Sequence, residues 1–325
     1  MKNSNEPLFF LFTCVKDGRK YIEKLFNSLL AQTKVNFVHY IYEDGSIDPI
    51  EDLVEIYKQK SLKLGKNIDI FYEKNPVNIG LNMATKHCIE QCNKPYFIWM
   101  NCDDWLDSHF FENLEYAVNK NKEATVFQSK MMVHYGAQTY FIPRGHYEKY
   151  LMRQSKKKDI FIGGNFHYNH FAVKTDDFFK INPSCFFINN KKYFNDVQTI
   201  LPFIFTDSKF VYVNKSVSHY LKRLDSEFYE NNNFTDLHDE LFCELNIHNY
   251  ENSFELKDSI SGYRTRLSSY MMGNDYKKLK KEIFKYKQFL ISCGLDTKKF
   301  YFAGINFKFI NLYLFKLKIQ RLFKK

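Results

Sequence analysis

The chain has 325 residues, of which 45% are hydrophobic and 26% are charged, and this balance excludes a disordered or fibrous protein. Its length favours one large domain with a smaller appendage. The formal net charge is +10, but residues 273–325 alone carry a net +11 and the remainder about −1. A basic end indicates an anionic partner, either a membrane or a nucleic acid, and leaves the rest of the chain nearly neutral.

The seven cysteines are odd in number and scattered along the chain, and no hydrophobic leader is evident. We therefore expect reduced thiols in a cytoplasmic protein. No run is long and apolar enough to cross a bilayer, because Lys316, Lys318 and Arg321 interrupt even the apolar stretch near the C-terminus.

The first hundred residues alternate between strand and helix patterns. Short apolar runs predict strands, and apolar residues at helical spacing predict helices between them. The strands are expected at 8–15, 38–42, 68–72 and 96–100, and the helices at 21–30, 50–60 and 81–91. This order is typical of βαβ units with a largely parallel sheet.

Beyond residue 106 the pattern is less regular. Strands are expected at 125–134, 171–174 and 210–213, and a helix that begins with an aspartate at 194–205. From about residue 236 the spacing of apolar residues is helical to the end of the chain. The polar, Asn-rich stretch before it predicts a domain boundary.

Polar and acidic segments follow the first four predicted strands, at 13–17, 43–46, 75–80 and 101–104. Ligands of an open parallel sheet bind at the carboxyl ends of its strands, so these segments are expected to converge on one edge. An activated sugar carries a diphosphate that gains negative charge as it leaves, and a divalent cation on a short acidic motif stabilises that charge. Asp103 and Asp104 fit this need, although the same residues also suit a helix N-cap.

These segments resemble the family 2 glycosyltransferases, which have the GT-A fold. The resemblance covers roughly residues 8–226 and is strongest over the first 110. It rests on four motifs in the expected order: Asp17–Ile22 with Ser28–Thr33, Tyr42–Asp48, Asn78–Gly80 with Ala84, and Asn101–Trp105.

The resemblance implies a nucleotide-sugar donor and a divalent cation, Mg²⁺ or Mn²⁺. It makes Asp104 the more direct metal ligand, with Asp103 beside it, and it puts Thr13 and Asp44 along the base and ribose. Asp196 would take the proton from the acceptor hydroxyl, so that transfer inverts the anomeric configuration. The residues expected to bind the nucleotide sugar are Thr13, Asp17, Glu43, Asp44, Asn78, Gly80, Lys86, Asn101 and Asp103.

The chain departs from the family pattern at several positions. Asn101 stands first in the metal motif and brings no charge, while Lys86 is expected to restore a cation near the phosphates. A histidine that the family often has near the end of the domain is missing from residues 220–223. The residues expected to contact the diphosphate or the acceptor in its place are His219, Arg223, His167 and His170, although a single histidine is more often structural.

We therefore expect an α/β protein with a GT-A domain at 1–228 and an all-helical C-terminal region at 229–325. Within the domain, residues 1–110 would bind the nucleotide sugar and residues 111–228 would form the acceptor side. The expected reaction is inverting sugar transfer from a nucleotide-diphosphate sugar, UDP being the commonest donor, to an acceptor hydroxyl. The expected setting is the assembly of a bacterial surface polysaccharide or glycolipid.

Basic and apolar residues alternate at 307–325 in a helical pattern. Such a helix either lies on the inner face of the cytoplasmic membrane, near a lipid-linked acceptor, or packs on the catalytic domain or on a second subunit of a homo-oligomer.

Two other functions compete with sugar transfer. A nucleotidyltransferase acting on a sugar phosphate needs a Gly-rich loop after the first strand, and this chain lacks repeated glycines there. A non-enzymatic nucleic-acid-binding protein is disfavoured because the α/β part is nearly neutral with acidic loops, so no nucleic-acid partner is expected.

Overall fold

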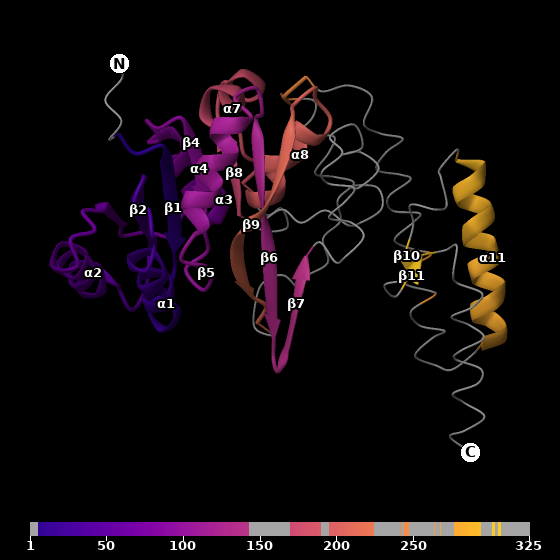
Figure 1. Cartoon of the computed structure of the whole chain (residues 1–325), viewed down its shortest axis with the longest axis horizontal. Coiled ribbons are helices and arrows are strands. Elements are labelled where there is room, and N and C mark those ends of the chain that lie inside the picture. Colours follow the sequence, from indigo (N-terminus) through magenta and orange to yellow (C-terminus); the bar gives the residue numbers. More distant parts are fainter. Residues whose placement is uncertain are drawn as a thin grey trace. The chain divides into compact units, whose positions relative to one another are not determined.

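The computed structural model describes residues 6–142, 170–189, 195–223, 241, 244–246, 263, 267, 276–293, 301–302 and 305–306. These residues fall into two compact units, one within 1–248 and the other within 249–325 (Figure 1). The two units are described separately below.

The first half of the larger unit is a parallel α/β layer. Its elements are β1 (Phe9–Val15), α1 (Arg19–Leu30), β2 (Phe37–Asp44), α2 (Glu51–Lys63), β3 (Asp69–Asn75), α3 (Leu81–Glu90) and β4 (Tyr96–Trp99). The strands lie in the order β3-β2-β1-β4 and are all parallel. The four strands and three helices predicted for this half are confirmed. Every residue of β2 is buried, as expected for a parallel strand covered on both faces.

The second half extends the same sheet. Its elements are β5 (Trp105–Leu106), α4 (Phe110–Lys120), β6 (Val126–Tyr135), β7 (Gln138–Ile142), β8 (Phe171–Lys174), α7 (Thr175–Ile181), α8 (Asn195–Ile204) and β9 (Phe210–Leu221). The order becomes β3-β2-β1-β4-β8-β6-β9-β5, with β7 beside β6 (Figure 1). Because β8 runs antiparallel to both β4 and β6, the sheet is mixed, and the predicted parallel arrangement holds for its first half.

Strand β9 is much longer than the predicted strand at 210–213. The pairing of β9 with β6 shifts register next to Ser129, and the exposed Asn214 and Lys215 break the apolar pattern there. The strand then continues to Leu221 and carries its last residues to the acidic loop after β4.

The many phenylalanines and tyrosines pack mainly into the core. The Phe37 and Phe111 rings stack at 4.1 Å and the Phe26 and Tyr57 rings at 4.3 Å, joining α4, α1 and α2 to the sheet. Each buried aromatic contributes roughly 1.5–3 kcal/mol of hydrophobic stabilisation.

The smaller unit contains α11 (Tyr276–Ser292), β10 (Tyr301–Phe302) and β11 (Ile305–Asn306). Along α11, Tyr286 is fully buried and stacks on Tyr263 at 5.1 Å. The two short strands pair antiparallel, so the prediction of an all-helical C-terminal region is wrong at 301–306.

Two further predictions concern residues outside the described part of the chain: the domain boundary at 228/229 and the basic helix at 307–325. Within the described residues, no helix has the length and apolar character needed to span a membrane.

Candidate active site

The loop after β4 carries the predicted metal motif, and its second aspartate is fully buried. Asp104 Oδ1 accepts the Leu221 amide at 2.9 Å, while Oδ2 accepts Asn101 Nδ2 at 2.9 Å and lies 3.0 Å from His170 Nε2. Both carboxylate oxygens are therefore used by the fold. Its carboxylate is fully buried in the structure, and the expectation that Asp104 is the more direct metal ligand stays a prediction.

His170 has a buried structural place instead of the expected acceptor contact. Its side chain is 0% exposed, Nε2 meets Asp104, and Nδ1 lies 2.8 Å from Ser218 Oγ. Its φ of 60° is in the left-handed region, which is uncommon for a residue other than glycine. The surrounding contacts hold this conformation, since Ser129 Oγ donates to the His170 carbonyl. His167 lies outside the described residues.

Asp103, the residue directly before Asp104, has a different set of partners. Its carboxylate Oδ2 lies 2.9 Å from Arg223 Nε, and its side chain is 12% exposed. The guanidinium of Arg223 lies over the Tyr21 ring, 4.6 Å from the centroid. Burial and the charge of Asp104 together raise the pKa of Asp103 to about 6, against the opposing charge of Arg223. Arg223, an expected diphosphate contact, thus lies at the acidic loop.

Asp196, the expected base, is the second residue of α8 and is half-buried. Burial raises the pKa of its carboxyl to about 6, while the Val197 amide and the charge of His170 oppose that change. The pKa of the Tyr220 phenol is raised by burial, and it is raised further by the charges of Asp104, Asp196 and Asp103. The charge of Asp196 and the charges of both aspartates of the acidic loop thus act on the same phenol.

On the other half of the sheet, the acidic turn after β2 organises the neighbouring loop. The Asp44 carboxylate accepts the amides of Ile79 at 2.8 Å and Gly80 at 3.0 Å, while Asn78 Oδ1 also accepts the Gly80 amide. Gly45 has a φ of 63° and lies so close to the loop that a Cβ would stand 2.4 Å from the Asn78 nitrogen. Asp44 thus shapes this loop, and its contact with the base and ribose stays a prediction.

Three other expected nucleotide contacts have structural partners. Thr13 is 0% exposed and its Oγ1 lies 3.1 Å from His39 Nε2. Glu43 is also 0% exposed and accepts the Tyr72 hydroxyl. Lys86 donates to the carbonyls of residues 184 and 185 and pairs with Glu90 at 3.0 Å. These contacts give the three side chains partners within the fold, and their contact with the donor stays a prediction.

Six of the nine expected nucleotide contacts keep some exposure: Asp17, Asn78, Gly80, Lys86, Asn101 and Asp103. Asp17 has a φ of 51° and its Oδ1 accepts the Ile47 amide at 2.8 Å, which ties the loop after β1 to the loop after β2. These polar groups border the side of the sheet where a nucleotide would lie.

His219, the other expected diphosphate contact, has three side-chain partners in the structure. Its Nε2 lies 2.7 Å from Asp107 Oδ1, its Nδ1 lies 3.0 Å from His134 Nε2, and its ring stacks on Trp105. Sequence reasoning did not single out Asp107, His134 or Trp105. Tyr21 and Tyr220 belong to sequence motifs described above, but no role was predicted for either residue.

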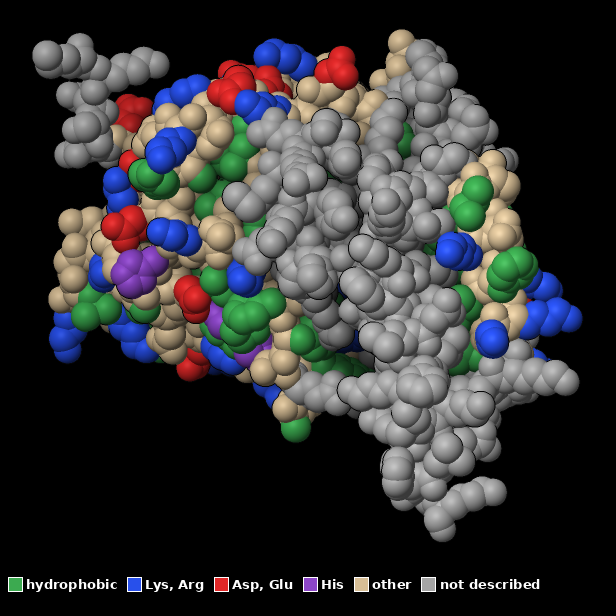
Figure 2. Space-filling model, turned by 45° about the vertical axis from the view of Figure 1, so that its right-hand side comes forward, with side chains coloured by type: hydrophobic (Ala, Val, Ile, Leu, Met, Phe, Trp, Pro, Cys, Tyr) green, Lys and Arg blue, Asp and Glu red, His purple; other side chains and the backbone are tan. Residues whose placement is uncertain are grey.

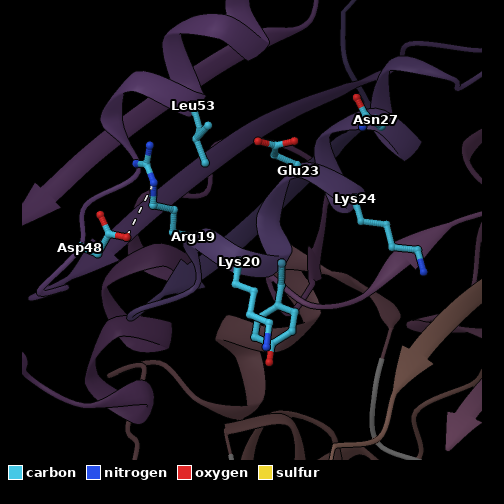
Figure 3. Close-up of a pocket in the computed structure, with 8 residues that line it drawn as sticks. Arg19, Lys20, Glu23, Lys24, Asn27, Asp48 and Leu53 are labelled. Carbon is cyan, nitrogen blue, oxygen red and sulfur yellow. Dashed lines mark ion pairs between the residues drawn. The ribbon is translucent and has the colours of Figure 1, made fainter. Parts of the chain in front are cut away.

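An open cavity of about 670 Å³ runs along the exposed side of α1 (Figure 3). Its lining residues are Arg19, Lys20, Tyr21, Glu23, Lys24, Asn27, Asp48 and Leu53. Arg19 pairs with Asp48 at one end, and Lys24 points away from them. Tyr21 belongs both to this lining and to the Arg223 contact, so the cavity borders the acidic loop.

The donor set decides which metal arrangement is chemically reasonable. Among the described residues, no group of three or more His, Cys, Asp or Glu side chains could hold a metal ion. Asp103 and the amide of Asn101 supply oxygen ligands of the kind that Mg²⁺ and Mn²⁺ prefer. A cation that takes most of its ligands from phosphates and water fits this single carboxylate.

A protein-family model described as "Glycosyl transferase family 2" matches residues 11–178, which is more than half of the chain. The chain belongs to glycosyl transferase family 2. An uncharacterized glycosyltransferase of Rickettsia typhi is 29% identical to this family 2 chain over 128 residues, and one of Haemophilus influenzae is 27% identical over 135. The matches cover 39% and 40% of the chain, but only 37% and 38% of those two proteins.

Solved structures show the same fold as this family 2 chain. The structure of Staphylococcus aureus TarS 1–349 in complex with UDP-GlcNAc has a TM-score of 0.59 and 16% identity, with 78% of the chain and 70% of TarS 1–349 covered. A structure of GalNAc-T7 with UDP, GalNAc and Mn²⁺ has a TM-score of 0.51 and 11% identity, with 80% and 55% covered. The GT-A-like α/β fold predicted from the sequence is thereby confirmed for the larger unit.

Proposed function

We propose that the chain transfers a sugar from a nucleoside-diphosphate sugar to an acceptor hydroxyl, with inversion at the anomeric carbon. The observation that carries the proposal is the half-buried Asp196, whose pKa is raised to about 6, near Asp103 and Arg223. A carboxylate with a pKa just below neutral is well matched to remove a proton from a hydroxyl at physiological pH.

The donor nucleotide is proposed to bind across β1 and β2. Asp17 and Asn78 border this edge, and Asp44 holds the loop of residues 78–80 in place through two backbone amides. UDP is the proposed carrier, since the TarS and GalNAc-T7 structures both include a uridine nucleotide. The guanidinium of Arg223 is proposed to bind the diphosphate, and its contacts with Asp103 and the Tyr21 ring set its orientation.

During transfer, Asp196 would accept the proton of the acceptor hydroxyl as its oxygen attacks the anomeric carbon, while the nucleoside diphosphate leaves on the opposite side. Asp103 would hold Mg²⁺ or Mn²⁺, with Asn101 beside it, and such a cation neutralises charge on the leaving diphosphate. Asp104 has a supporting part: it holds the loop through Asn101 and Leu221.

The acceptor is proposed to be a saccharide or a lipid-linked saccharide in surface polysaccharide or glycolipid assembly at the inner face of the cytoplasmic membrane. The basic residues at 307–325 support the membrane contact through their charge, and a homo-oligomer is the other use of that segment. Nucleic-acid binding finds no support on the face shown in Figure 2, where the described acidic and basic side chains are interspersed.

A thermal-shift screen of nucleotide sugars and nucleoside diphosphates, with and without Mn²⁺, tests the proposal. We expect a UDP-containing ligand to raise the melting temperature, and more so with the cation. A screen in which no nucleoside diphosphate stabilises the protein, with or without Mn²⁺, would contradict the donor site.

A further inference from the structure

A chain of three polar side chains takes no part in the proposed mechanism. Asp107 Oδ1 lies 2.7 Å from His219 Nε2, and His219 Nδ1 lies 3.0 Å from His134 Nε2. The His219 ring stacks on Trp105 with centroids 5.0 Å apart and planes 7° from parallel, and the ammonium of Lys24 lies 3.1 Å from the centre of the same indole. Both histidine rings are thus fixed in orientation by their neighbours.

The polarity of these hydrogen bonds follows from elementary chemistry. An ionised carboxylate only accepts, so His219 Nε2 must carry the hydrogen that points to Asp107. If His219 is neutral, its single N–H is the one on Nε2, so its Nδ1 accepts and Nε2 of His134 donates. Nδ1 of His134 is therefore left with a lone pair.

Two observations support this assignment for His134. Burial lowers the pKa of His134, and the nearby charge of Lys24 lowers it further, which favours the neutral ring. Its Nδ1 has no hydrogen-bond partner among the described residues, and the side chain is partly exposed. A polarised chain therefore ends in an unused hydrogen-bond acceptor.

The position of His134 in the sheet indicates whether the donor or the acceptor would contact it. His134 lies near the end of β6, and in the order β3-β2-β1-β4-β8-β6-β9-β5 that strand is separated from the nucleotide-side strands by β4 and β8. It is nevertheless joined to the site, because the Lys222 amide donates to its carbonyl at 2.9 Å and Arg223 follows directly. A ligand at this position belongs to the acceptor side.

We propose that Nδ1 of His134 accepts a hydrogen bond from a hydroxyl of the saccharide acceptor, and that Asp107 and His219 are positioning residues that hold the required tautomer. The inference rests on the proposed function and identifies part of its acceptor subsite. A lone pair on nitrogen pairs with an O–H donor and not with an ionised phosphate, so a neutral sugar unit of the acceptor lies here.

The tautomers are measured by long-range proton–nitrogen NMR on the full chain labelled with ¹⁵N-histidine, with the His134 signals identified from His134→Phe. We expect both His134 and His219 to carry hydrogen on Nε2 and none on Nδ1. A spectrum in which His134 carries hydrogen on Nδ1 would overturn the proposal.

Ligand binding is then followed by titrating the methyl glycosides of glucose, galactose and N-acetylglucosamine in the presence of UDP. We expect at least one glycoside to shift Nδ1 of His134, with affinity about tenfold lower in His134→Phe, the size of one lost hydrogen bond. His134→Asn, which keeps an acceptor atom near the position of Nδ1, should bind better than His134→Phe. If the side chain only filled space, the order would reverse, because phenylalanine preserves the ring.

UDP affinity separates this proposal from the proposed function. Unchanged UDP binding in both His134 variants and in the control His109→Gln would show that they fold and keep the donor site. UDP binding with no glycoside effect on His134 overturns this proposal alone. Absence of UDP binding in the unmodified chain, with and without Mn²⁺, contradicts the donor site as well.

Discussion

Replacing Asp196 with asparagine is expected to stabilise the protein at neutral pH while it abolishes transfer. The pKa of Asp196 is raised by burial from 3.8 to about 6, so the ionised form costs roughly 3 kcal/mol of folding stability. That cost is fully present above pH 6, shrinks as the pH falls through the folded pKa, and is gone below about 3.8, where the carboxyl is protonated in both states. Asparagine carries no charge and can still accept the Val197 amide.

Urea unfolding of the two proteins between pH 4 and pH 8 measures this difference. We expect the Asp196→Asn variant to gain about 1–3 kcal/mol at pH 8 and nothing at pH 4. The transfer rate of the unmodified protein should fall as the pH drops below about 6, because the base becomes protonated. Asp176 is also the second residue of its helix but is exposed, so Asp176→Asn is the matched control and should gain nothing.

A loss of stability in Asp196→Asn that is equal at pH 4 and pH 8 would refute this reasoning. Asp196 would then be a helix-capping residue whose side chain contributes the same at every pH. Retained turnover in the variant would separately remove Asp196 as the base.

Three further outcomes are expected. His170→Gln should lower stability by about 1–3 kcal/mol in urea unfolding, because it removes the imidazole that lies 3.0 Å from the buried Asp104 carboxylate. Gly45→Ala should cost more stability than Gly65→Ala and should weaken nucleotide binding; both positions have positive φ, but only at Gly45 would a Cβ meet the backbone of Asn78. Asp103→Asn should remove any Mn²⁺-dependent part of the thermal shift caused by UDP, while metal-free UDP binding persists.

The parallel half of the fold could be predicted from the sequence because its signals are local. Apolar runs and helical spacing mark β1 to β4 and the helices between them, and polar loops follow each strand. The antiparallel half could not be predicted in the same way. Strand β9 is interrupted by the exposed Asn214 and Lys215, and its pairing with β6 depends on residues about 85 positions away.

In the candidate site, too, local features could be predicted from the sequence and contacts between distant residues could not. Adjacent aspartates look equivalent in sequence, yet Asp103 faces Arg223 and Asp104 faces His170. The partner of Asp104 is 66 residues away and holds a left-handed backbone conformation, neither of which leaves a local signal. Motif position therefore places both aspartates in one loop but does not reveal that Asp104 is buried and Asp103 is partly exposed.

The same contacts explain why an asparagine can stand first in the motif. Asn101 Nδ2 donates to Asp104 Oδ2 at 2.9 Å, so an aspartate in the same conformation would bring a second carboxylate against a buried one. Two like charges at that distance would raise the pKa of one carboxyl or push the loop apart. Asn101 instead adds a hydrogen bond to Asp104, which also contacts His170. The negative charge on the more exposed side of the loop is then that of Asp103. The missing charge at Asn101 thus strengthens the support of the loop that carries Asp103.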